Sequence, residues 1–157
     1  MRRAAAVIAV LACLGFAADA LGLPPFTTAR KTSPGGSGQA DMFAISTGCH
    51  ATFDRFVIRA RNARPGYDVR YVRRVIADPS GNPVSLRGTK RILLVSHNAT
   101  GHQLPRVKTP LCPNLRQVKL SGDFEGVVSF GLGLARKTGF RVFRLTGPTR
   151  IVVDVKH

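Results

Sequence analysis

The chain has 157 residues, of which 24 are lysine or arginine and 8 are aspartate or glutamate, so its formal net charge is +16. This length fits one domain and leaves no room for a second large one. The charge favours polyanionic partners through summed Coulomb attraction and counterion release, but it does not distinguish nucleic acid, anionic lipid and acidic wall polymers.

The N-terminus has the layout of a secretory signal peptide. Arg2-Arg3 precedes an apolar run over residues 4–18, and Ala18-Asp19-Ala20 has the small residues of a cleavage site. The run is shorter than the roughly 20 apolar residues of a membrane-spanning helix. We therefore predict a signal peptide over residues 1–20 and an exported or envelope-associated protein, which excludes chromosomal nucleic acid as the partner. The sequence Val10-Leu11-Ala12-Cys13 resembles a lipobox, so lipid attachment at Cys13 is an alternative.

Cleavage at that site leaves two cysteines, Cys49 and Cys112. An even pair in an oxidising compartment predicts a disulfide. The alternative is a metal site in which His50 and either His97 or His102 join the two cysteines, but no CxxC or HxxxH spacing supports it. The sequence indicates no cofactor.

Residues 21–47 are rich in proline, glycine, serine and threonine and show no sustained apolar period, so we predict a flexible spacer there. The folded domain is then expected over residues 48–157. In this region apolar residues alternate with polar ones at period two, as Phe56, Ile58 and Ala60 do, which predicts strands with one buried face.

The same pattern predicts further strands and a closing hairpin that turns at Gly147-Pro148, with Ile151, Val153 and Val155 facing inward. Several short strands without a helical stripe favour an antiparallel sandwich or an open barrel. The predicted strand regions are residues 52–62, 67–75, 90–98, 115–135 and 143–157.

Four short motifs resemble the AMIN-like domain of secreted actinobacterial proteins, a relative of the AMIN domain that accompanies cell-wall amidases. They are Phe53-Asp54-Arg55, Pro65-Gly66-Tyr67, Gly122-Asp123-Phe124-Glu125-Gly126 and residues 148–155. The resemblance covers about residues 49–157. It implies an all-β, antiparallel two-sheet β-sandwich and a non-catalytic role at the cell envelope, by analogy with modules that target enzymes to peptidoglycan.

Arginines on the solvent faces of the strands are the candidate ligand-binding residues, because a guanidinium fork suits carboxylates and phosphates. A tyrosine ring can also stack on a sugar. We therefore predict a secreted, non-catalytic module that binds an anionic envelope polymer, either peptidoglycan or wall phosphates, or an envelope protein. Alternation places Arg73 and Arg74 on opposite faces, so all the arginines share one surface only if a bulge intervenes. The predicted contacts are Arg59, Arg61, Arg70, Arg73, Arg74, Tyr67 and Tyr71.

Two other readings stay open. Asp123 and Glu125 lie two residues apart, which on a strand places both carboxylates on one face, so a wall hydrolase is one alternative. A structural or partner-binding sandwich without a polymer ligand is the other. Arg150 and Asp154 share a strand face and are expected to form an ion pair.

Overall fold

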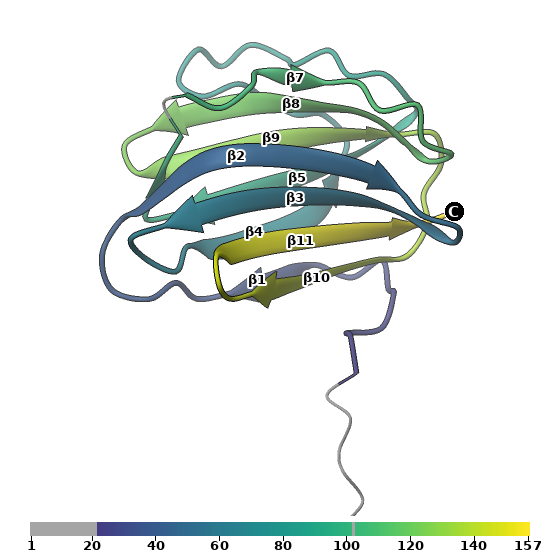
Figure 1. Cartoon of the computed structure of the whole chain (residues 1–157). Coiled ribbons are helices and arrows are strands. Elements are labelled where there is room, and N and C mark those ends of the chain that lie inside the picture. Colours follow the sequence, from purple (N-terminus) through teal and green to yellow (C-terminus); the bar gives the residue numbers. More distant parts are fainter. Residues whose placement is uncertain (1–21, 102) are drawn as a thin grey trace, which may run out of the picture.

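The computed structural model describes residues 22–101 and 103–157, so the predicted signal peptide, Cys13 and His102 lie outside the described part. The described chain forms two β-sheets that lie face to face, with no helix in this part (Figure 1). This confirms the predicted all-β two-sheet sandwich. None of the described residues belongs to a helix long and apolar enough to cross a membrane.

The larger sheet has six strands, in the order β1 (Lys31–Ser33), β4 (Gly66–Val72), β5 (Lys90–His97), β9 (Val127–Leu134), β8 (Leu115–Phe124) and β7 (Val107–Lys108). The smaller sheet has five, in the order β10 (Phe140–Leu145), β11 (Thr149–Lys156), β3 (Phe53–Arg61), β2 (Ala40–Cys49) and β6 (Ala99–Thr100). All named pairs are antiparallel except β2 with β6, which is parallel.

The core lies between the two sheets and follows the predicted alternation. The predicted inward residues of the closing hairpin, Ile151, Val153 and Val155, are at most 1% exposed. Phe56 of the smaller sheet meets Phe130 of the larger one with 5.3 Å between ring centroids, in an edge-to-face arrangement that favours contact beyond simple area burial. The period-two pattern therefore identified the core-facing side of these strands.

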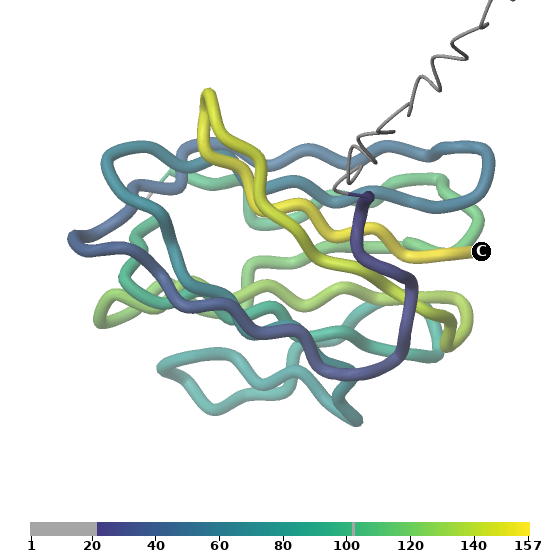
Figure 2. Tube along the Cα trace, turned by 90° about the horizontal axis from the view of Figure 1, so that it is seen from below, coloured from purple at the N-terminus to yellow at the C-terminus, as the bar shows by residue number. Residues whose placement is uncertain are grey.

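The predicted spacer over residues 21–47 is wrong where it covers β1 and most of β2. Ala40, Met42 and Ile45 of β2 are all core residues. A bulge between Met42 and Ala44 shifts the register, so the buried positions do not keep period two, and this hid the strand. Upstream, Thr27 bridges to β10 and β1 pairs with β4, so this segment passes from one sheet to the other (Figure 2).

The connection between β4 and β5 lies against the outer face of the larger sheet, where two glycines admit it. A Cβ atom at Gly131 would lie 2.8 Å from the Leu86 side chain, and one at Gly133 only 2.0 Å from the Arg87 carbonyl oxygen. Both separations are shorter than real Cβ contacts. These two glycines therefore allow a loop to pack directly on the sheet.

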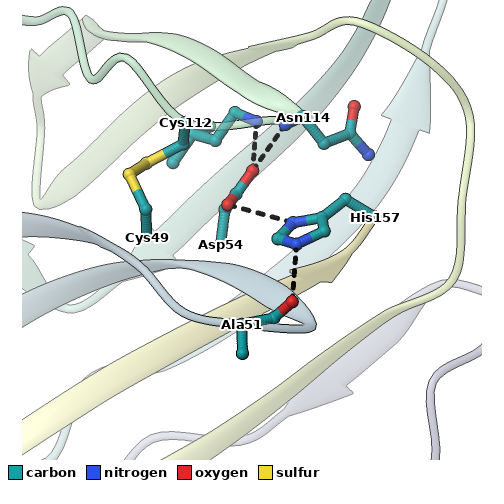
Figure 3. Close-up of a disulfide and its surroundings, with 7 residues drawn as sticks. Cys49, Ala51, Asp54, Cys112, Asn114 and His157 are labelled. Atoms are coloured by element: carbon teal, nitrogen blue, oxygen red, sulfur yellow. Dashed lines mark hydrogen bonds and ion pairs between the residues drawn. A yellow bond between two sulfur atoms is a disulfide. The ribbon is translucent and has the colours of Figure 1, made fainter.

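The predicted disulfide is confirmed. Cys49 ends β2, Cys112 precedes β8, and their Cα atoms are 5.3 Å apart, so the bond joins the two sheets (Figure 3). Beside it the Asp54 carboxylate accepts hydrogen bonds from the backbone N–H groups of Asn114 and Leu115, at 2.6 and 2.7 Å. The alternative metal site needs two free thiolates, and the disulfide occupies both sulfurs.

Candidate functional site

The predicted arginines do not share one surface. Arg59 and Arg61 are exposed on β3 of the smaller sheet, while Arg70 lies on β4 of the larger sheet. Arg73 and Arg74 follow the end of β4 and are exposed. Because inward positions of both sheets fill the core, the outward arginines of β3 and β4 point to opposite sides of the sandwich.

Two of these arginines already have carboxylate partners. Arg61 lies 2.7 Å from the Asp41 carboxylate. Arg70 and Arg30 both contact Asp68, each at 2.5 Å, and Asp68 is only 8% exposed. Burial alone would raise the pKa of Asp68, but the hydrogen bonds from Arg30 and Arg70 outweigh it and lower the pKa. An anionic ligand would have to compete with these internal ion pairs. This disfavours Arg61 and Arg70 as ligand contacts.

The Asp68 ion pairs should make stability depend on acid. A carboxyl whose pKa is lowered by folding stabilises the native state above its unfolded pKa of about 4, and this contribution is lost as the pH falls through the folded pKa. We expect Asp68→Asn to lower the free energy of unfolding at pH 7 more than at pH 3. Urea unfolding at both pH values measures this, and an equal loss at both would contradict it.

Both predicted tyrosines are partly buried against the core. The Tyr71 hydroxyl donates to the Thr138 carbonyl oxygen at 2.7 Å and accepts from the Thr138 N–H at 3.1 Å, and burial raises its pKa. The Arg144 guanidinium lies 4.9 Å from the Tyr67 ring centroid, and Lys137 lies 5.4 Å from that of Tyr71. A stacking sugar would have to displace one of these cations.

A hollow of about 430 Å³ opens where β4 ends and β5 begins, and it is lined by Tyr71, Val72, Arg73, Thr89, Lys90, Arg91 and Lys137. A second hollow of about 360 Å³ shares Arg73 and Arg91 with it and adds Arg74. We call Tyr71, Arg73, Arg74, Lys90, Arg91 and Lys137 together the cationic groove. No carboxylate lines either hollow, and within the described residues none of the groove's cations forms an ion pair.

Strand register and one loop contact assemble the groove. Antiparallel pairing of β4 with β5 sets Val72 opposite Arg91, so the basic start of β5 lies beside the arginines that follow β4. Lys137 comes from the connection between β9 and β10, which the hydrogen bonds between Tyr71 and Thr138 hold in place. The sequence analysis named Arg73 and Arg74 among the candidate contacts but did not name Lys90, Arg91 or Lys137. Their proximity depends on pairing that alternation alone does not specify.

The alternative carboxylate pair is not arranged as expected. Asp123 belongs to β8, but Glu125 lies in the turn between β8 and β9 with a φ of 47°, so the two do not share a strand face. An oxygen of Asp123 accepts the Gly101 N–H at 3.1 Å. The expectation that both carboxylates face one substrate from one strand is therefore wrong.

Asp154 pairs with different arginines from the one expected. Its buried carboxylate forms ion pairs with Arg55, at 2.6 Å, and with Arg141, at 2.8 Å. The predicted ion pair with Arg150 is therefore wrong. Arg150 instead lies directly opposite Arg59 across β11 and β3. This places two like charges side by side on the smaller sheet, far from the groove on the larger sheet.

The fold is a two-sheet β-sandwich with one disulfide between the sheets. A family model for the AMIN-like domain matches residues 40–157, well over half of the chain, so the chain belongs to the AMIN-like domain family. Membership indicates a peptidoglycan-associated binding module, in a family whose domains are generally non-catalytic and typically periplasmic or wall-associated. The match begins with β2, the strand that was predicted as spacer. Comparison with curated proteins and with solved structures gives no match.

Proposed function

We propose that this protein is an exported, non-catalytic module that binds an anionic polymer of the cell envelope, peptidoglycan or wall phosphates, in the cationic groove. The main supporting observation is that two adjoining hollows are lined by exposed or half-buried cations and by no carboxylate. Family membership supports the envelope as the setting. Export rests on the N-terminal pattern of the sequence.

The groove suits an extended polyanion better than a small enclosed ligand. Its two hollows meet at Arg73 and Arg91, so charges on successive units of a polymer can meet successive guanidinium groups. Unpaired cations also need not leave an internal partner when the ligand binds. In contrast, binding through Arg61 or Arg70 would cost their pairs with Asp41 and Asp68.

The proposal predicts that neutralising the groove weakens binding more than the same charge loss elsewhere. We expect Arg73→Gln with Arg91→Gln to reduce binding to purified sacculi about tenfold or more, since each charge-assisted hydrogen bond contributes roughly 1.5–3 kcal/mol. The matched control is Arg59→Gln with Arg150→Gln, which removes the same charge from the smaller sheet. Co-sedimentation at rising salt measures both affinity and the ionic contribution.

The control variant shows whether binding depends on the cationic groove or on the net charge of the protein. Equal losses in both double variants would mean that net charge alone drives binding and would overturn the groove. A larger loss of affinity in the variant with Arg59→Gln and Arg150→Gln would indicate that the binding site lies on the smaller sheet.

A further inference from the structure

The loop between β7 and β8 holds an apolar side chain almost fully in solvent. Leu111 is 92% exposed, and Val107 in β7 is 46% exposed. The next residue, Cys112, is completely buried in the disulfide, and the backbone just beyond it is bound by Asp54. Leu111 is therefore displayed from a fixed backbone.

Two arginines lie beside this leucine. A hollow of about 380 Å³ beside it is lined by Leu111, Pro110, Thr109, Thr89, Gly88, Ala135 and two arginines, Arg87 and Arg116. The neighbouring Arg106 and Lys108 are exposed as well. From residue 79 to residue 122 the sequence has no aspartate or glutamate, so no acidic residue of this stretch offsets these charges.

We propose that this loop docks on an anionic phospholipid surface, with Leu111 entering the boundary between headgroups and acyl chains and a lipid phosphate lying in the hollow between Arg87 and Arg116. An apolar side chain with arginines beside it suits such a surface, because the partition of the apolar group into the membrane and the attraction to anionic headgroups add to each other. A hydrophilic wall polymer offers nothing that would bury Leu111. A second copy of this strongly basic chain would be repelled by the same cations.

The docking surface is separate from the cationic groove. Its phosphate hollow shares only Thr89 with the larger groove hollow and shares no cation with it. The protein can therefore hold a wall polymer in one place and a lipid surface in another. Substitutions in one surface should therefore weaken binding there and leave binding at the other surface intact.

Sedimentation with vesicles tests the proposal. Wild-type protein, purified after export, should bind vesicles of mixed phosphatidylglycerol and phosphatidylcholine and should not bind phosphatidylcholine alone. Leu111→Ser should weaken binding to the mixed vesicles about tenfold, as loss of one partitioned leucine side chain allows. Phe124→Ser is the matched control, because Phe124 is 44% exposed at the far end of β8, about 30 Å along the strand. All variants share one N-terminus, so that segment does not affect the comparison.

Two further comparisons separate the contribution of the arginines from that of Leu111 and separate vesicle binding from sacculus binding. Arg87→Gln with Arg116→Gln should weaken binding to mixed vesicles at least tenfold, whereas Arg73→Gln with Arg91→Gln should retain most of it. Leu111→Ser should bind sacculi as wild type does, so failure here is distinct from failure of the groove. Equal binding of wild type and Leu111→Ser to mixed vesicles, or tighter binding to soluble polyphosphate that excludes vesicles, would overturn lipid docking.

Discussion

Replacing Cys49 and Cys112 together by serine is expected to lower the free energy of unfolding by about 4 kcal/mol. The disulfide links residues 63 positions apart, and on the chain-entropy model the closed loop restricts the unfolded chain by that amount. It also ties the end of β2 in one sheet to the segment before β8 in the other. Guanidinium unfolding of the double variant and the wild type measures the difference.

Reduction gives an independent control. Wild-type protein in excess reductant should unfold at the same denaturant concentration as the double serine variant, and reductant should not affect the variant. The displayed loop should also loosen, so vesicle binding through Leu111 should fall more than sacculus binding. A loss of stability below about 1 kcal/mol would show that packing, and not the cross-link, holds the sheets together.

The fold was largely predictable because inward-facing and outward-facing residues alternate along regular strands such as β3. In β3 the alternation runs without interruption, and Phe56 and Ile58 are buried as expected. In β11 Val153 and Val155 belong to the core as expected, but Val152 and Asp154 beside them are buried as well. The alternation failed in β2, where the bulge around Phe43 inserts one residue and reverses the pattern. The composition also favoured the wrong prediction, because the proline, glycine and serine of the flanking segment are typical of a flexible linker.

The site was less predictable because charge pairing depends on register between distant strands. Asp154 pairs with Arg55, 99 residues away, and with Arg141 on the neighbouring strand, while the nearby Arg150 donates to backbone carbonyl oxygens instead. Likewise Arg61 and Arg70 read as free ligands until their pairing with Asp41 and Asp68 is known. The groove's Lys137 could not be found from sequence, because its position follows from a hydrogen bond between Tyr71 and Thr138.

The second large effect is expected at Asp54, a fully buried carboxylate within the AMIN-like fold. One of its oxygens accepts the N–H groups of Asn114 and Leu115, and the other lies 3.2 Å from the His157 ring (Figure 3). Asp54→Ala leaves two buried donors without an acceptor and removes the partner of the imidazole. Because each orphaned group costs roughly 1–3 kcal/mol, we expect a loss of about 3–5 kcal/mol in the free energy of unfolding.

The variant Asp54→Asn distinguishes the contribution of Asp54 as a hydrogen-bond acceptor from the contribution of its negative charge. The asparagine oxygen can still accept from the backbone of residues 114 and 115, while its amide group faces His157 without a negative charge. If backbone anchoring dominates, Asp54→Asn should lose less than half of what Asp54→Ala loses in guanidinium unfolding. If both variants lose the same amount, the charge facing His157 is the main contribution instead. A loss under about 1 kcal/mol in Asp54→Ala would mean that water replaces the carboxylate and that the start of β8 does not depend on it.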